Sequence, residues 1–251
     1  MVLARVRLAD GRVERLTPSG MVASEFDVGA EGRAVIVATA VDRPAELAAV
    51  TSRGLRTLTR HNDAWLREVT LAPARDVEFD NGAGQSIGAI VVEPRGTHPA
   101  TGWPMLLRLH GGPVSQHQHE FDFAWQLFAS RGYAVVAPNP RGSTGRGHAF
   151  QKALFAKWGE VDVVDVLAVT DGVVRSGVAD PARLGVGGWS YGAILTNYVI
   201  ASDTRFKAAT SGAGIANMLA GYGTDQYVRE YEVELGLPWD KTDLWLRLSY
   251  P

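Results

Sequence analysis

The sequence predicts an α/β fold with a mainly parallel sheet over residues 71–251, preceded by an all-β segment over residues 1–70. Three observations support this prediction. Segments with strand-like and helix-like spacing of apolar residues alternate after residue 71. A Gly-x-Ser-x-Gly motif at residues 188–192 joins a strand pattern to a helix pattern. The first 70 residues alternate apolar and polar positions in short runs that end at glycine, aspartate or serine.

The N-terminal segment contains strand patterns over residues 32–39 and 46–50. Residues 8–17 resemble residues 50–59 at an offset of 42 residues, which lies in the range of a four-stranded propeller blade. We therefore expect residues 1–70 to form the C-terminal blades of a β-propeller. A blade and a half cannot close a ring, so the segment would be the end of a longer propeller. An ordinary β-meander with a chance repeat is the alternative.

The second segment begins with a predicted hairpin and continues with strands that alternate with helices. This alternation is typical of a parallel sheet covered on both faces. The hairpin is expected over residues 76–80 and 87–92. Further strands are expected over residues 105–109, 133–137, 183–187 and 206–210, and helices over residues 121–131, 161–176 and 191–202.

The motif at residues 188–192 reads Gly-Trp-Ser-Tyr-Gly and is typical of a nucleophile elbow. In such a turn, side chains at Gly188 and Gly192 would collide with neighbouring backbone. Their absence lets Ser190 project its hydroxyl above the sheet, which makes Ser190 the candidate catalytic nucleophile. The alternative is a glycine-rich turn that carries an ordinary serine.

A second motif, His-Gly-Gly-Pro at residues 110–113, follows the strand that ends at Leu109. Loops of this type supply a backbone N–H to an oxyanion hole. We expect the N–H groups of Gly112 and Tyr191 to be the two donors. Each such donor typically contributes about 3 kcal/mol to transition-state stabilisation. We expect His110 to shape the loop rather than to act as the catalytic base.

Taken in order, the motifs at residues 110–113, 139–145 (Asn-Pro-Arg-Gly-Ser-Thr-Gly) and 188–192 resemble the prolyl oligopeptidase family of serine peptidases. The similarity is greatest to its acylaminoacyl-peptidase and dipeptidyl-peptidase branches, and it covers residues 75–251. It implies an α/β-hydrolase domain below a propeller that filters substrates by size. It also implies hydrolysis of short peptides through a seryl ester on Ser190. Some relatives carry an oxyanion-binding tyrosine in the loop at 139–143, where this sequence has Pro140.

The chain departs from the family after Ser190. The catalytic order in such folds is serine, then an acid, then histidine, but all six histidines precede Ser190. The spacing of His117, His119 and His148 fits surface positions better than that of a base. We therefore expect a fragment that is truncated at both ends, lacks the last strands of the fold and is nearly inactive. Loss of a triad histidine lowers turnover by about 10⁶-fold.

Composition limits the remaining hypotheses. Hydrophobic residues make up 46% and charged residues 21%, which is enough for a packed core, and the net charge of −2 argues against nucleic-acid binding. The absence of cysteine excludes disulfides, a cysteine nucleophile and thiolate metal sites. Residues 1–7 lack the apolar core of a signal peptide, and no run approaches the ~18 apolar residues of a membrane span. We therefore expect no membrane partner and weakly favour a cytoplasmic location.

No cofactor and no metal are expected, and the expected partner is a short peptide substrate. Homo-oligomerisation of a full-length parent, the residue preference of the enzyme and exo- against endopeptidase action stay open. Two alternatives also stay open. The elbow and the Gly-Gly loop serve ester cleavage equally well, which allows an esterase or lipase-like hydrolase. The missing histidine allows a degenerate, non-catalytic hydrolase domain.

Overall fold

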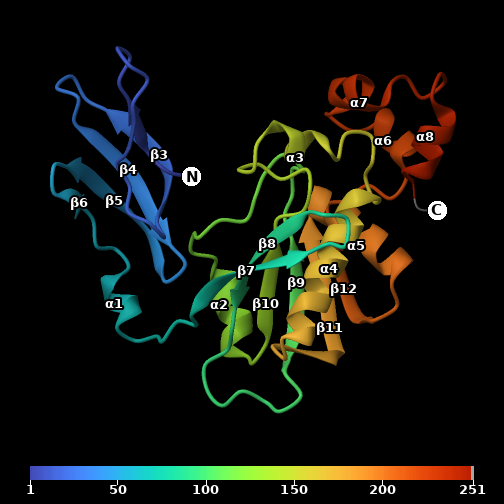
Figure 1. The fold of residues 1–251 in the computed structure, drawn as a ribbon, viewed down its shortest axis with the longest axis horizontal. Helices are drawn as coiled ribbons and strands as arrows, with labels where there is room; N and C mark the ends of the chain where they lie inside the picture. Colours follow the sequence, from blue (N-terminus) through green and yellow to red (C-terminus); the bar gives the residue numbers. More distant parts are fainter. Residues whose placement is uncertain (250–251) are drawn as a thin grey trace. The chain divides into compact units, whose positions relative to one another are not determined.

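The computed structural model describes residues 1–249, and their contacts divide them into two units. The first unit comprises residues 1–74, 92–95 and 118–131. The second comprises residues 75–91, 96–117 and 132 onward. Figure 1 labels the helices and strands of both units.

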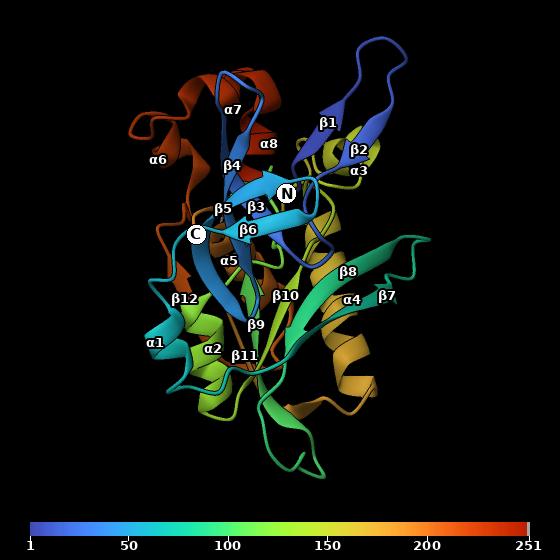
Figure 2. The same ribbon diagram turned by 90° about the vertical axis from the view of Figure 1, so that its left-hand side faces the viewer.

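The first unit contains a small hairpin and a four-stranded antiparallel sheet. The sheet strands pair in sequence order, so the sheet is a meander, and Figure 2 shows them side by side. Ile36, Ala38 and Ala48 are buried on its inner face. The hairpin strands are β1 (Ala4–Val6) and β2 (Val13–Arg15). The sheet strands are β3 (Val22–Val28), β4 (Ala34–Ala40), β5 (Arg43–Thr51) and β6 (Gly54–Thr57).

Two helices complete this unit, α1 (Asp63–Leu66) and α2 (Phe123–Ser130). The side chain of Asp122 caps α2 by accepting a hydrogen bond from the Trp125 amide at 3.0 Å. Buried Gln126 then accepts from the Ala72 amide at 2.7 Å and donates to the Ala72 carbonyl at 3.2 Å. This pair of bonds attaches α2 to the chain segment that follows α1.

The second unit is built on a six-stranded sheet with the order β12-β11-β9-β10-β8-β7 (Figures 1 and 2). Parallel pairing joins β10 to β9, β9 to β11, and β11 to β12. All five residues of β10 are buried, as expected for an apolar strand inside a parallel sheet. The strands are β7 (Ala74–Asp80), β8 (Ser86–Val92), β9 (Trp103–Leu109), β10 (Ala134–Pro138), β11 (Ala179–Trp189) and β12 (Phe206–Gly212).

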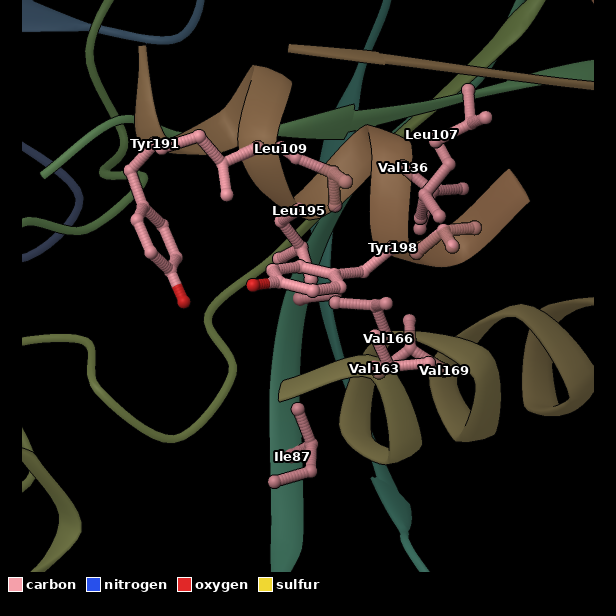
Figure 3. Packing of buried hydrophobic residues seen from close by; sticks show 14 of the residues in the cluster. Ile87, Leu107, Leu109, Val136, Val163, Val166, Val169, Tyr191, Leu195 and Tyr198 are labelled. Atoms are coloured by element: carbon pink, nitrogen blue, oxygen red, sulfur yellow. The ribbon is translucent and has the colours of Figure 1, made fainter. Parts of the chain in front are cut away.

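Helices α4 (Val161–Arg175) and α5 (Tyr191–Ser202) pack against this sheet and against each other. Figure 3 shows Leu195 and Tyr198 of α5 between strand residues and the valines of α4. The valines are Val163, Val166 and Val169, spaced three residues apart so that they share one helix face.

Four shorter helices complete the unit: α3 (His148–Lys152), α6 (Met218–Tyr222), α7 (Val228–Leu235) and α8 (Thr242–Arg247). Trp245 of α8 is fully buried and joins the main core. The Tyr198 hydroxyl donates to the Leu248 carbonyl at 2.9 Å, which links the end of α8 to α5. The strand β12 lies at one edge of the sheet, and Lys207 to Ser211 on it are exposed.

The strands and helices expected from apolar spacing are confirmed, with bounds that differ by a few residues. The helix expected over 191–202 has the same bounds as α5. The four-stranded meander has the strand pattern of one propeller blade. Its membership of a propeller stays a prediction, as does the domain division at residue 70.

The packing of α4 on β7 can be tested at Gly172, because a Cβ there would overlap the ring of Phe79. Alanine favours an isolated helix over glycine by about 1 kcal/mol, but overpacking costs roughly 1–3 kcal/mol. We expect Gly172→Ala to lower the free energy of unfolding by about 1–2 kcal/mol in urea titrations. The control is Gly223→Ala, whose Cβ would have no neighbour within 4 Å. Stabilisation by Gly172→Ala would contradict this packing.

Candidate active site at the turn between β11 and α5

Ser190 lies between the end of β11 and the first residue of α5, outside the helix itself. Its backbone has φ 57° and ψ −124°, a conformation that costs a non-glycine residue about 1–3 kcal/mol. The Ser190 amide donates to the Gly212 carbonyl at 2.9 Å, which ties the turn to the end of β12. The Ser190 carbonyl accepts from the amides of Ala193 and Ile194 and so begins α5. The sharp strand-to-helix turn expected at this position is confirmed.

The glycines on either side of Ser190 make the turn possible. A Cβ on Gly188 would overlap the backbone of Gly192, and a Cβ on Gly192 would overlap the carbonyl of Leu109. The end of β11, the start of α5 and the end of β9 therefore meet backbone to backbone. Only glycine fits at these two positions, which is the reason for the motif.

The loop after β9 lies directly beside the nucleophile candidate. A Cβ built on Gly111 would stand 3.5 Å from Ser190 Cβ and 3.9 Å from Ser190 Oγ. The next residue, Gly112, has φ 119°, a conformation that glycine adopts readily. The loop motif and the elbow motif thus come together in space. The assignment of the Gly112 and Tyr191 amides as oxyanion donors stays a prediction.

His110 shapes this loop through both ring nitrogens. Nδ1 lies 2.7 Å from the Gly111 carbonyl, which can only accept, so Nδ1 carries the proton and donates. Nε2 then accepts from the hydroxyl of buried Ser143 at 2.9 Å. Burial lowers the pKa of His110, which favours this neutral form. With both nitrogens engaged by other groups, His110 is not placed to take a proton from Ser190.

His117 does not occupy the surface position that its polar neighbours suggested. Its ring packs edge-on against His110 with centroids 5.1 Å apart, and Nε2 lies 2.9 Å from the Arg108 carbonyl. Burial lowers the pKa of His117 to about 3, so it stays neutral at ordinary pH. Asn139 causes this placement, because its side chain accepts from the His117 amide at 2.7 Å and donates to the His117 carbonyl at 3.0 Å. His148 is exposed, as expected.

The loop at residues 139–145 is fixed by an ion pair that the sequence analysis did not identify. Arg141 makes a two-nitrogen contact with Asp165 of α4 at 2.8–3.1 Å. Asp165 is fully buried and also accepts from the Arg141 amide and from the Asn81 side chain. A buried pair of this kind is costly to break because the remaining charge loses its partner. The ion pair therefore holds the loop that binds His110 and His117.

Asp162, one helical turn earlier on α4, holds the elbow in a similar way. Its Oδ2 accepts from the hydroxyl of buried Tyr191 at 2.7 Å. Burial raises the pKa of Asp162 to about 6 and raises that of Tyr191 well above its usual value. Asp162 was not predicted from the sequence, although two aspartates three residues apart on the valine face of a helix indicate buried, partnered carboxylates.

The aromatic residues near the elbow have different roles. Trp189 is 68% exposed beside Ser190. Tyr231 is buried and donates to Asp225 at 2.7 Å, while Tyr222 donates to Glu232 at 2.6 Å. Tyr231 and Tyr222 therefore serve packing around α7. Tyr227 is about half exposed.

Neither a membrane-spanning helix nor a metal cluster is found within residues 1–249. Each helix there is too short or too polar to cross a bilayer. Likewise, no three side chains of the histidine, aspartate and glutamate type converge in that range as metal ligands would.

Comparison with known proteins decides the family. The profile of the Prolyl oligopeptidase family matches residues 119–250, just over half of the chain. The chain belongs to the prolyl oligopeptidase family. This confirms the resemblance drawn from the motifs at residues 110–113, 139–145 and 188–192.

The similar proteins agree with this membership. The uncharacterized peptidase YuxL of Bacillus subtilis (strain 168) is 33% identical over 214 residues, which cover 83% of this chain and 33% of that protein. Dipeptidyl-peptidase 5 of Aspergillus oryzae is 32% identical over 68% of this chain and 24% of its own length. The Pyrococcus horikoshii acylaminoacyl peptidase superposes with a TM-score of 0.87 at 26% identity, covering 96% of this chain and 39% of that one. A puromycin hydrolase gives a TM-score of 0.84 at 25% identity over 99% of this chain and 39% of its own.

These superpositions and the family membership confirm that the chain has the α/β-hydrolase fold. The chain spans a third of the length of YuxL and about a quarter of the length of the Aspergillus oryzae dipeptidyl-peptidase 5. Activity, substrates and partners of the whole protein are therefore matters for proposal.

The close approach at the elbow can be tested at Gly192. A Cβ there would meet main-chain atoms of Leu109 and His110, which cannot rotate away as a side chain can. We expect Gly192→Ala to lower the free energy of unfolding by about 3 kcal/mol or more, or to prevent folding. Gly223→Ala is the matched control, expected within about 0.5 kcal/mol of the parent. Equal urea midpoints for the two variants would contradict the backbone contact.

The raised pKa of Asp162 predicts a pH-dependent stability. Between its usual pKa of 3.8 and about 6, the folded state holds a proton that the unfolded state releases. The stability from this proton is present below pH 4 and is lost as the pH rises through 6, by up to about 3 kcal/mol. Relative to the parent, Asp162→Asn should therefore gain stability between pH 4 and pH 7. Urea unfolding of both proteins across this range measures the difference.

The free energy of unfolding of Asp162→Asn must be compared with that of the parent at each pH. The lowered pKa values of His110 and His117 change the stability of both proteins with pH in the opposite direction to Asp162. The stability that the two neutral histidines contribute is lost as the pH falls below 6.5, their usual pKa. Subtraction removes their contribution, since it is common to both proteins. A difference that stays constant from pH 4 to pH 7 would contradict the raised pKa of Asp162.

Proposed function

We propose that the protein containing this chain hydrolyses peptide bonds of short peptides, with Ser190 as the nucleophile. The Ser190 hydroxyl attacks the peptide carbonyl, its proton passes to a general base, and the amine leaves as the seryl ester forms. Water then hydrolyses that ester and frees Ser190. In both tetrahedral intermediates, the amides of Gly112 and Tyr191 donate hydrogen bonds to the negatively charged carbonyl oxygen.

One observation carries the proposal: the hydroxyl of Ser190 stands at a strained turn directly beside the glycine loop after β9. A Cβ built on Gly111 would lie 3.9 Å from Ser190 Oγ. The loop backbone and the hydroxyl are therefore close enough to contact the same carbonyl group of a bound substrate. Strained backbone of the kind at Ser190 clusters at active sites. Membership of the prolyl oligopeptidase family and the peptidases among the similar proteins support a peptide substrate.

The general base is proposed to come from outside residues 1–249. His110 and His117 lie beside the glycine loop. Both ring nitrogens of His110 and Nε2 of His117 are directed at other partners, and burial lowers the pKa of both histidines. A serine without a base is a weak nucleophile at neutral pH. The 251-residue chain by itself is therefore proposed to be nearly inactive.

The proposal predicts a specific outcome for Ser190→Ala in the protein expressed from its complete reading frame. Turnover of aminoacyl- and peptidyl-nitroanilides should fall by about 10⁴-fold or more, because the acyl-enzyme can no longer form. Unfolding curves of the variant should match the parent. The isolated chain should show only background turnover on the same substrates.

A nitrophenyl-ester panel run alongside distinguishes the alternative reaction. Turnover of esters with none of nitroanilides would replace the peptidase by an esterase. Turnover that survives Ser190→Ala would remove Ser190 from the mechanism. Absence of turnover on both panels in the complete protein would favour a binding domain.

A further inference from the structure

We infer that Asp162 is a positioning residue for the reaction. By binding the Tyr191 side chain, Asp162 fixes the orientation of the Tyr191 backbone amide, which donates a hydrogen bond to the oxyanion. The inference rests on the proposed function, because the Tyr191 amide matters only if Ser190 forms an acyl-enzyme. It extends that proposal to a buried side chain of α4, on the far side of Tyr191 from the nucleophile.

The hydroxyl of Tyr191 donates to Asp162 Oδ2 at 2.7 Å, and both side chains are buried. The other carboxylate oxygen of Asp162 accepts from the Val163 amide at 3.0 Å. Asp162 is therefore fixed to the first turn of α4 by one oxygen and holds Tyr191 by the other. A short bond between two buried groups leaves the ring of Tyr191 little freedom.

A second set of contacts holds the same ring from another direction. Trp158 packs edge-on against Tyr191 with centroids 5.3 Å apart. The Trp158 indole N–H donates to Glu234 of α7 at 2.7 Å, and the Ala156 amide donates to the same oxygen at 2.9 Å. The Tyr191 ring thus lies between α4 and a loop that α7 fixes in place.

The amide of Tyr191 needs such an anchor because of its place in the chain. Tyr191 is the first residue of α5, and the first amides of a helix have no partner inside it. The preceding Ser190 has strained dihedral angles, so the peptide between them would relieve strain by rotating. The Tyr191 side chain resists this rotation, because moving the peptide plane would drag the ring out of its contacts with Asp162 and Trp158.

The chain contains a matched control for this argument. Tyr198 lies on the same helix two turns later, is also buried, and also uses its hydroxyl, which donates to the Leu248 carbonyl at 2.9 Å. Loss of that hydroxyl removes a comparable bond from the same core, but at a distance from the elbow. Tyr198→Phe therefore reports the general cost of a lost hydroxyl, and Tyr191→Phe reports that cost together with any effect on the amide.

The test uses Tyr191→Phe, Asp162→Leu, Asp162→Asn and Tyr198→Phe in the complete protein with a peptidyl-nitroanilide. We expect Tyr191→Phe and Asp162→Leu to lower kcat by about tenfold, because a misoriented donor stabilises the transition state less. KM should change by less than about twofold, since the anchor does not touch the bound peptide. Asp162→Asn should recover most of kcat, because its amide oxygen still accepts from Tyr191. Tyr198→Phe should retain the parent kcat.

A peptide boronic acid provides a second readout that does not depend on turnover. It forms a tetrahedral adduct with the serine, whose oxygen occupies the place of the oxyanion. Tyr191→Phe should weaken its binding by about the same tenfold factor as kcat, while a non-covalent product peptide binds as in the parent. A purely structural loss would instead appear equally in Tyr191→Phe and Tyr198→Phe.

The outcomes separate the two proposals. If turnover survives Ser190→Ala, the proposed function fails and the inference fails with it. If Ser190→Ala abolishes turnover but Tyr191→Phe and Asp162→Leu keep the parent kcat and boronate affinity, only the inference is overturned. A loss in Tyr198→Phe as large as in Tyr191→Phe also overturns it. Should Asp162→Leu fail to fold, the comparison of Tyr191→Phe with Tyr198→Phe still decides.

Discussion

The site depends on one constraint: three pieces of backbone must meet without side chains between them. Gly188 and Gly192 bring the end of β11 and the start of α5 against the carbonyl of Leu109 at the end of β9. The turn that results forces positive φ on Ser190 and lifts its hydroxyl beside the glycine loop. The cost of this strained conformation is offset by the packing of α5 on the sheet, where seven of its first eight residues are buried.

Helix α4 adds a second level of control over the same region. Its Asp162 and Asp165 are one turn apart on a valine-rich face, and each buried carboxylate holds a different loop. Asp165 pairs with Arg141 and so fixes the segment that binds His110 and His117. Asp162 holds Tyr191 at the elbow. Because burial makes an unpartnered carboxylate costly, the two loops are held in place by the folding of one helix.

The sequence predicted the elements whose signal is local. The apolar spacing of residues 191–202 gave α5 with the same bounds, and the glycines at 188 and 192 predicted the sharp turn before it. The half-buried position of His117 was not predictable in this way. Its polar neighbours Gln116 and Gln118 suggest a surface position, and Asn139, whose side chain binds the His117 backbone, lies 22 residues further on. Asp162 was missed for the same reason, since its partner Tyr191 is 29 residues away.

The state of the two histidines beside the glycine loop supports the proposal that the base for Ser190 lies in another part of the protein. A base has to be able to take a proton near neutral pH, which requires contact with water or with a carboxylate. The two histidines beside the glycine loop are poorly suited to this role, because both ring nitrogens of His110 already have partners and burial lowers the pKa of His117 to about 3. Protonation of His110 would place a proton on Nε2 and reverse the direction of its bond with Ser143, so that Ser143 would have to accept instead of donate. The hydrogen bonds that hold the loop therefore agree with the proposal that proton transfer is left to another group.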